Sequence, residues 1–238
     1  MDFSNQFQQI QNSVVRIISI TGQTPNIQIV SSGSGVLIGD GRKILTCSHC
    51  VVANTQTVAV LSGQNNGQIV TAIFNDAAAD IAVLQAQNSM GNGVALGNSD
   101  NLRIGHEAFV AGYPSYGINI TALFAHIAGF ETHNGNQLLK IDSSVNHGNS
   151  GGPLFNSNGE LVAIVNSKFG NLSTFLTQVQ QANPKAAMVI GGINPVQVIQ
   201  QLIGEMKKNL NLGVGTAIPL RLIANLTNHV GDLLNPPV

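Results

Sequence analysis

The sequence predicts an all-β protein that folds as two antiparallel units, each a barrel or a sandwich. From Val14 onward, short apolar runs are broken by Gly, Asn and Asp, which is the pattern of short strands joined by turns. A bridge rich in Gly, Asn and Ser, Gly91–Asn101, divides these runs into two series. We therefore expect a first unit over residues 14–100 and a second over residues 101–238.

The first unit follows an N-terminal arm, residues 1–13. Phe3, Phe7 and Ile10 recur at helical spacing among Gln and Asn, which predicts a short amphipathic helix in this arm. Turn signals such as Gly39-Asp40-Gly41 separate the apolar runs that follow. The strands expected in this unit are Val14–Ile20, Ile27–Val30, Gly35–Ile38, Ile44–Thr46, Thr57–Leu61, Ile69–Phe74 and Ile81–Leu84.

The second unit combines strands with helices. Helical spacing after Ser173, and again after Asn194-Pro195, predicts a helical insertion at about residues 170–210. Pro219 begins an apolar C-terminal helix, at about residues 219–230, which we expect Gly231 to terminate. The strands expected in this unit are Ala108–Gly112, Ile118–Phe124, Leu138–Ile141, Leu161–Val165 and Val214–Ile218.

Composition and charge exclude several classes of protein. The 238-residue chain has 10 basic and 11 acidic side chains and no basic stripe that would bind phosphates, so we expect no nucleic-acid partner. No apolar run reaches the ~18 residues of a membrane-spanning helix, and we expect no membrane association. The N-terminus lacks the charged and apolar regions of a secretion signal. This predicts a cytoplasmic protein, or a secreted or periplasmic one whose leader has been removed.

The two cysteines, Cys47 and Cys50, lie three positions apart. They are too few for a disulfide framework, and no second pair completes a zinc site, so we expect neither a metal nor a cofactor. A redox-active pair is the alternative to two buried, reduced thiols. Because no βαβ pattern surrounds the pair, we favour the reduced thiols.

The segment Gly148-Asn149-Ser150-Gly151-Gly152-Pro153-Leu154 is the first indication of chemistry. A serine on a glycine-rich turn can present its hydroxyl outward while neighbouring N–H groups converge beside it. Acyl transfer needs this arrangement, since a nucleophile attacks a carbonyl whose developing oxyanion must be stabilised. An isolated match of this kind is more often an ordinary loop between strands, so the interpretation depends on partners elsewhere.

Two such partners lie upstream of Ser150. His49 ends one apolar strand and Asp80 begins another, although each residue alone is more often structural. Histidine, aspartate and serine in this chain order form one of the known orders of a catalytic triad. The first two residues fall in the first unit and the serine in the second. We therefore expect a site in the cleft between the two units.

These segments resemble the trypsin-like serine peptidases, and most closely their HtrA/Deg branch. The matching stretches are Gly33–Ile38, Leu45–Val52, Asp76–Leu84, Leu96–Gly105, Ile141–Leu154, Gly159–Ser167 and Gly213–Pro219. The resemblance implies two antiparallel six-stranded β-barrels of the chymotrypsin type and endopeptidase activity on proteins or peptides. It also implies a homo-oligomer, a trimer, assembled through the N-terminal arm.

The resemblance assigns a role to each matching residue. Ser150 would be the nucleophile, His49 the general base and Asp80 the group that orients the imidazole. The turn Gly148, Asn149 and Ser150 would form the oxyanion hole. Around it, the substrate would contact Ser144, Val145, His147, Val165, Asn166 and Ser167. Since Ser144 stands where trypsins carry a carboxylate, we expect cleavage after small or medium apolar residues.

The sequence also departs from the trypsin pattern. Asn149 replaces the aspartate that pairs with a new N-terminus in digestive trypsins, so we expect no activation by propeptide cleavage. Cys50 lacks its usual disulfide partner near Gly35. Few residues follow Gly231, so we expect no PDZ domain. The insertion at 170–210 is either a lid or subunit contact, or a helix pair packed on the outside.

Two other functions remain compatible with the sequence. One is a peptide-binding or chaperone-like module that keeps the fold without efficient turnover. The other is an interaction protein that assembles through the arm containing Phe3 and Phe7.

Overall fold

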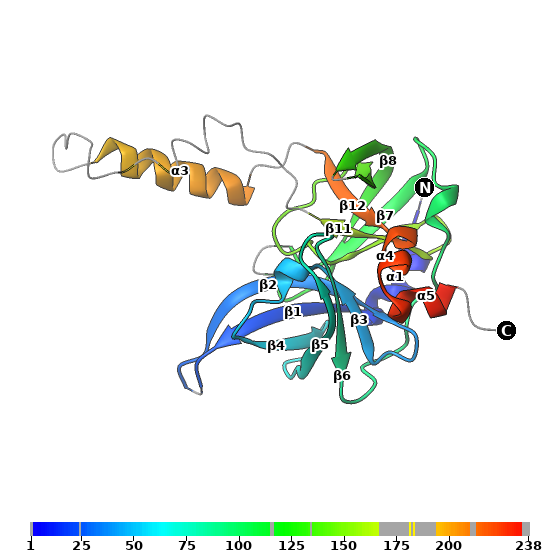
Figure 1. Ribbon diagram of the computed structural model, residues 1–238, viewed down its shortest axis with the longest axis horizontal. Coiled ribbons are helices and arrows are strands. Elements are labelled where there is room, and N and C mark those ends of the chain that lie inside the picture. Colours follow the sequence, from blue (N-terminus) through cyan, green and yellow to red (C-terminus); the bar gives the residue numbers. More distant parts are fainter. Residues whose placement is uncertain are drawn as a thin grey trace.

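The protein contains two closed antiparallel β-barrels of six strands each, which confirms the predicted fold class. The computed structural model describes residues 2–23, 25–114, 117–133, 135–166, 181, 183, 194–209 and 213–234. The two barrels lie next to each other, with a short helix near each end of the chain packed beside them (Figure 1). Among the described residues, no helix combines the length and the apolar character needed to cross a membrane.

The first barrel is formed by consecutive strands of the N-terminal half. Its strands are β1 (Val14–Thr21), β2 (Gln28–Ile38), β3 (Lys43–Thr46), β4 (Gln56–Leu61), β5 (Gln68–Asp76) and β6 (Ile81–Ala86), in the order β1-β2-β3-β6-β5-β4. On β1, Val15 and Ile17 are fully buried inside the barrel, while Arg16 and Ile18 are only half-buried. This alternation follows from the two-residue period of a strand.

The second barrel repeats this architecture. Its strands are β7 (Glu107–Gly112), β8 (Thr121–His133), β9 (Asn136–Ile141), β10 (Pro153–Asn156), β11 (Leu161–Asn166) and β12 (Gly215–Pro219), in the order β10-β11-β12-β9-β8-β7. The interior is filled by buried aliphatic side chains such as Val110, Ile127 and Leu139. A separate apolar cluster joins side chains of both barrels, including Cys47 and Cys50 of the first with Tyr113 and Phe155 of the second. This shared core holds the two barrels in one position, so residues from each can meet.

Three strand predictions were incomplete. The two expected strands Ile27–Val30 and Gly35–Ile38 are one long strand, β2, which runs through Gly33. A Cβ on Gly33 would lie 2.4 Å from the Cys50 Sγ, so this glycine permits close approach and does not interrupt the strand. Strand β8 begins at Thr121, three residues later than expected, and continues to His133. Strand β10 was missed because it has four residues and begins with proline.

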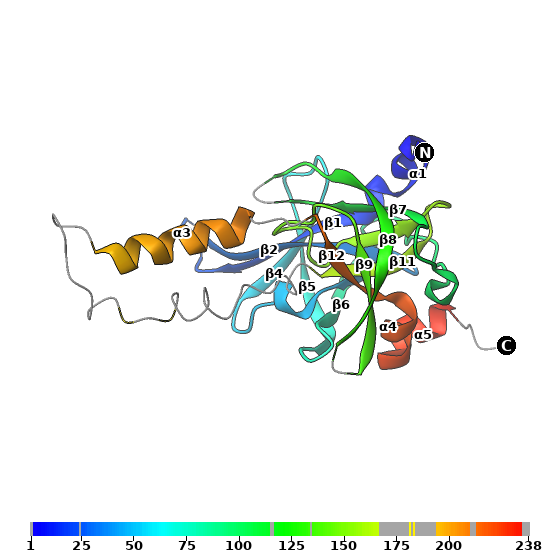
Figure 2. The same cartoon turned by 90° about the horizontal axis from the view of Figure 1, so that it is seen from above.

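The helices agree with the prediction in part. The arm forms α1 (Ser4–Ile10) and a 3₁₀ turn, η1 (Gln11–Ser13). In the insertion, α3 (Pro195–Asn209) begins at the expected proline and extends away from both barrels (Figure 2). The other helical spacing expected after Ser173 lies outside the described residues.

The single C-terminal helix expected at 219–230 is wrong, because the chain forms two helices. They are α4 (Leu220–Leu226) and α5 (Asn228–Leu234), and Thr227 between them is extended. The Thr227 Oγ1 accepts a hydrogen bond of 3.3 Å from the N–H of His229, which caps the second helix. Gly231 lies inside α5, where a Cβ would come within 3.0 Å of the Ala224 carbonyl oxygen. The glycine therefore allows α4 and α5 to pack closely and does not terminate a helix.

Candidate active site

His49 lies on a one-turn 3₁₀ helix directly after a buried strand. Strand β3 ends at Thr46, Cys47 is extended, and η2 (Ser48–Cys50) follows. The turn is closed by backbone hydrogen bonds from Cys50 to Cys47 and from Val51 to Ser48. Strand β3 is paired on both sides, so the start of this turn is fixed by the barrel.

Asp80 lies at the start of β6, which pairs with β3. Its backbone is in the left-handed region, with φ of 57°, an uncommon conformation for a residue other than glycine. The preceding turn is held by Asp76, whose Oδ1 accepts hydrogen bonds of 2.9 Å from the N–H groups of Ala78 and Ala79. This geometry directs a carboxylate that is 4% exposed toward His49.

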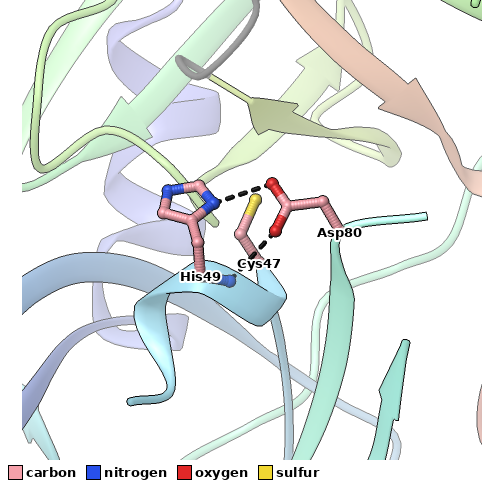
Figure 3. Close-up of side chains that lie close together, drawn as sticks. All are labelled: Cys47, His49 and Asp80. Carbon is pink, nitrogen blue, oxygen red and sulfur yellow. Dashed lines mark hydrogen bonds and ion pairs between the residues drawn. The ribbon is translucent and has the colours of Figure 1, made fainter. Parts of the chain in front are cut away.

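The Asp80 carboxylate fixes the orientation of the imidazole. The Oδ1 atom accepts a hydrogen bond of 3.0 Å from the backbone N–H of His49, and Oδ2 lies 2.7 Å from the ring Nδ1. Both contacts are drawn in Figure 3, where the second ring nitrogen points away from Asp80. An ionised carboxylate only accepts hydrogen bonds, so Nδ1 carries a proton and Nε2 of the neutral ring is left as the basic nitrogen.

Asn166, at the end of β11 in the other barrel, also binds Asp80. Its Nδ2 donates a hydrogen bond of 2.8 Å to the Oδ2 of Asp80, and its side chain is 1% exposed. The sequence suggested a substrate contact for this residue. The structure instead places the Asn166 amide against the Asp80 carboxylate, which also binds His49. No local sequence pattern signals this contact, which joins residues 86 positions apart.

Ser150 lies on the glycine-rich turn that precedes β10. Gly148 and Gly151 have positive φ angles of 94° and 80°. A Cβ on Gly151 would lie 2.2 Å from the carbonyl oxygen of Ser34, so the turn requires glycine for space as well as conformation. The turn is attached to its own barrel by a hydrogen bond of 2.9 Å from the Gly151 N–H to the Val165 carbonyl.

The serine turn is also attached to the first barrel, which brings it to the histidine. The N–H of Ser34 donates to the Ser150 carbonyl at 2.8 Å, and the Ser34 hydroxyl donates to the Gly148 carbonyl at 2.6 Å. Cys50, the neighbour of His49, places its thiol 3.5 Å from the same Ser150 carbonyl. The turn that carries Ser150 therefore contacts the first barrel next to His49.

The neighbourhood of Gly148 has the features of an anion-binding turn. The Ser34 hydroxyl binds the Gly148 carbonyl, and the positive φ of Gly148 sets the directions of the peptide groups on either side of it. Among the described residues, the Gly148 N–H has no hydrogen-bond partner. Asn149 is 1% exposed, and neither its Nδ2 nor its Oδ1 has a partner in the described part of the chain. Such a buried amide is costly, since each unpaired polar group loses its hydration.

Two opposing effects set the pKa of His49. Burial lowers the pKa of the imidazole, but the hydrogen bonds to Asp80 and Cys50 outweigh burial and raise it to about 9. The neighbouring carboxylate stabilises the imidazolium form in the same direction. The protonated form of His49 is therefore favoured at neutral pH, and the basic form increases as the pH rises toward 9.

Cys47 lies directly beside the His–Asp pair. The Cys47 Sγ, a His49 ring nitrogen and an Asp80 oxygen lie within 4.8 Å of one another, a separation that a metal ion could bridge. Hydrogen bonds account for this proximity, because the Cys47 thiol donates to the Val165 carbonyl at 3.4 Å and His49 binds Asp80. An ion here would have to break the His49–Asp80 pair. Cys47 and Cys50 are both buried, and no disulfide joins them.

The residues suggested for substrate binding differ in exposure. Ser144 and His147 are exposed near the serine turn, while Val145 is 9% exposed and packs in the core of the second barrel. Val165 is fully buried, and it is the Val165 backbone that holds Gly151 and Gly152. Ser167 lies outside the described residues.

A second His–Asp pair, His126 and Asp142, is exposed in the second barrel. Asp142 accepts hydrogen bonds from the backbone N–H and from the ring Nδ1 of His126, the latter at 2.9 Å. This is the same bonding pattern as in His49–Asp80. Both side chains of the second pair are well exposed, at 39% and 49%.

The fold and the arrangement of the site residues together define the class of this protein. A double six-stranded barrel with a His–Asp pair in one barrel and a serine turn in the other is the architecture of a trypsin-like peptidase domain. Residues 33–164 match the family described as trypsin-like peptidase domain, which is more than half of the chain. The chain belongs to this family.

Relatives place the chain near the HtrA/Deg proteases. It is 33% identical over 149 residues to the chloroplastic Protease Do-like 2 of Arabidopsis thaliana, covering 58% of this chain and 24% of that protein. It is 33% identical over 138 residues to the periplasmic pH-dependent serine endoprotease DegQ of Escherichia coli, covering 56% and 30%. The chain thus spans about a quarter to a third of the length of these relatives.

A solved structure of an HtrA-type protease with a tripeptide has the same fold. The TM-score is 0.68, and the alignment covers 99% of this chain and 64% of the other at 20% sequence identity. The double barrel is therefore shared over essentially the whole chain.

Proposed function

We propose that this protein is a serine endopeptidase that hydrolyses peptide bonds of protein substrates through an acyl-enzyme on Ser150. The observation that carries the proposal is the 2.7 Å contact between the His49 Nδ1 and Asp80, which leaves the other ring nitrogen as a base in the cleft. The Cys50 thiol, next to His49 in the sequence, lies 3.5 Å from the Ser150 carbonyl. Membership of the trypsin-like peptidase family supports the same chemistry.

The proposed reaction has two acyl-transfer steps. The Ser150 Oγ forms a bond to the scissile carbonyl carbon while its proton moves to the Nε2 of His49. The resulting oxyanion collapses, the C–N bond breaks, and the imidazolium gives its proton to the leaving amine. Water then repeats the sequence in place of the serine and releases the acid, with Ser150 regenerated. Asp80 stays ionised throughout and stabilises the imidazolium.

The proposed oxyanion hole is the turn that contains Gly148, Asn149 and Ser150. We assign the N–H of Gly148 as one donor, since it has no partner among the described residues, and the N–H of Ser150 as the other. Asn149 lies between them and holds the turn through its backbone bonds to Asn146 and Gly152. Preorganised donors of this kind stabilise the charge that develops on the carbonyl oxygen.

Small or medium apolar residues are the proposed side chains at the cleavage point. Ser144, His147 and the buried Val145 carry no carboxylate, so these three suggested substrate contacts offer no anionic partner for Lys or Arg. The contacts of Asn166 with Asp80 remove that amide from the set of substrate ligands. A peptide-library cleavage profile tests this preference, and dominant cleavage after Lys or Arg would contradict it.

Labelling with a fluorophosphonate tests the proposed function. At pH 9 we expect rapid labelling of the intact chain, none of Ser150→Ala and at least a hundredfold slower labelling of His49→Ala. His126→Ala is the matched control, because His126 has the same bonding pattern to an aspartate but both side chains of that pair are well exposed. Labelling that survives Ser150→Ala, or that is lost equally in both histidine variants, would contradict the assignment.

A peptide-binding or chaperone-like module is the second candidate. Two observations favour it: the pKa of His49 is raised to about 9, and the amide of Asn149 is buried without a partner among the described residues. Both would be expected of a site that is not poised for turnover at neutral pH. Absence of labelling at every pH between 7 and 10, with the fold intact, would select this function instead.

Assembly through the N-terminal arm is part of the proposal. Phe3 packs on Phe109 and Phe124 of the second barrel, with ring centroids 4.9 Å and 5.3 Å apart. Phe124 nonetheless remains 44% exposed. A cavity of about 280 Å³ lies beside these rings and is also lined by Phe7. This exposed aromatic surface supports a homo-oligomer, with a trimer as the proposed state.

A further inference from the structure

A second cavity lies between the two barrels on the outer side of strand β1. It has a volume of about 370 Å³ and is formed by strands β1 and β4, the turn after β4, and the residues that follow β7. Its walls combine a cation, amides and apolar side chains. They include Arg16, Ile18, Val60, Gln64, Tyr113 and Asn119.

The cavity is connected to the serine turn through one pair of residues on neighbouring strands. In the β1–β2 ladder, Arg16 lies directly opposite Ser34, so the two side chains are on the same face of the sheet. Ser34 binds the carbonyls of Gly148 and Ser150 and also accepts a hydrogen bond of 2.9 Å from the N–H of Tyr113. Ser34 therefore connects the serine turn to the wall of the cavity. A substrate chain that leaves Ser150 on the β2 side would reach the cavity within a few residues.

Arg16 is a cation without an anionic partner in this cavity. Its Nε donates a hydrogen bond of 3.0 Å to the Ser32 Oγ, and within the described part of the chain it forms no ion pair. By contrast, Arg42 on the same barrel binds Asp40 at 2.6 Å. Among the described residues that line the cavity, Arg16 is the only charged one. The guanidinium therefore leaves its terminal N–H groups for a ligand.

We propose that this cavity binds a carboxylate of the peptide substrate, on the β2 side of Ser150; the inference rests on the proposed endopeptidase function. A planar guanidinium matches a carboxylate with two parallel hydrogen bonds. Gln64 and Asn119 supply further donors, and Ile18 with Val60 offers an apolar wall for the methylene groups of a glutamate. The carboxylate can come from an acidic side chain or from the C-terminus of a peptide.

Peptide binding to the Ser150→Ala variant of the whole chain tests the proposal without turnover. The probes are fluorescein-labelled Ala/Val decapeptides with either Glu or Gln at one position, scanned along the peptide, each with a free or an amidated C-terminus. At the best position we expect Glu to lower the Kd about five- to tenfold relative to Gln, as for one half-buried, charge-assisted contact. An advantage of the free over the amidated terminus would identify the C-terminal carboxylate as the source.

Three further variants locate the effect. In Arg16→Gln and in Gln64→Glu, the second of which changes an exposed loop residue, the preference for the carboxylate should disappear. It should persist in Arg42→Gln, the matched control. Equal binding of all four peptide types, or a preference that survives both Arg16→Gln and Gln64→Glu, would overturn the proposal.

The result is independent of whether Ser150 reacts. Loss of fluorophosphonate labelling with the carboxylate preference intact would leave the cavity assignment standing and remove the peptidase one. Labelling without the carboxylate preference would leave the peptidase assignment standing and remove the cavity assignment.

Discussion

The side chain of Asn166 in the second barrel donates a hydrogen bond of 2.8 Å to the Asp80 carboxylate in the first, on the same oxygen that binds the His49 ring. The contact links the orientation of the imidazole to the relative position of the barrels. Because Asn166 ends β11, whose residue Val165 also holds the serine turn, one strand supports both halves of the site.

Removing that amide should impair the site more than the fold. We expect Asn166→Ala to lower kcat/KM about tenfold or more, because a hydrogen bond to a charged group is worth about 1.5–3 kcal/mol. Asn166→Ser, which keeps a donor, should recover part of the loss. Steady-state kinetics with a peptide substrate measure this effect. A fall in stability with unchanged kcat/KM would show that the residue is only structural.

Neutralising Asp80 should abolish most of the activity. In Asp80→Asn the amide no longer holds the Nδ1-protonated tautomer, and a loss of about 10³–10⁴ in kcat is expected. Asp142→Asn changes the exposed pair with His126 in the same way and should leave kcat within about twofold, since both side chains of that pair are well exposed. Similar losses in the two variants would indicate that the effect does not act through the cleft.

Activity should rise with pH because His49 acts as a base only when neutral. The imidazole pKa of about 9 predicts that kcat/KM increases through neutral pH and levels off above about 9. In Asp80→Asn the hydrogen bond to the carboxylate and its charge are lost, and the His49 pKa should fall. NMR titration of the His49 ring in Ser150→Ala gives the pKa directly. A His49 pKa at or below 6.5 in the otherwise unchanged chain would contradict the prediction.

The same shift couples pH to stability. Because the pKa rises from 6.5 to about 9 on folding, the contribution of His49 to the free energy of unfolding is complete below pH 6.5. It is lost progressively as the pH rises to about 9. Denaturant unfolding at several pH values should show this decline, and Asp80→Asn should remove it.

Glycine at position 148 should be required for turnover. Its φ of 94° disfavours a β-branched residue, so Gly148→Val should displace the proposed oxyanion donor and reduce kcat about 10²–10³-fold. The control is Gly105→Val, since Gly105 has a similar φ of 90° and open space around its Cβ position. It should cost a similar amount of stability without changing kcat. Normal cleavage by Gly148→Val would contradict the assignment of the Gly148 N–H as an oxyanion donor.

Deletion of residues 1–12 tests the arm. Phe3 is 9% exposed and packs against Phe109, so we expect the free energy of unfolding to fall by about 3 kcal/mol or more. Sedimentation should also show a smaller assembly if the arm joins subunits. An unchanged mass with reduced stability would restrict the arm to packing on its own barrel.

Much of the fold could be predicted from the sequence because strands depend on local patterns of residues. Apolar residues such as Val15 and Ile17, in a short run, indicate a strand with a buried face. The fold class was predicted from such strands. The errors arose where distant contacts overrule local signals. Gly33 was left outside the two expected strands and Gly231 was expected to end a helix, yet both permit close approach of another segment, the Cys50 thiol in one case and the Ala224 carbonyl in the other.

The sequence by itself determined the strand pattern, the residue types of the site and their order along the chain, because backbone preference and side-chain chemistry are properties of short segments. The tertiary structure alone decided that Asn166 supports Asp80, that Ser34 connects the serine turn to the first barrel, and that Arg16 faces a cavity beside it. These contacts join residues that lie far apart in the sequence, most of them in different barrels. Their energies depend on how the closed barrels pack against each other, which no local stretch of sequence specifies.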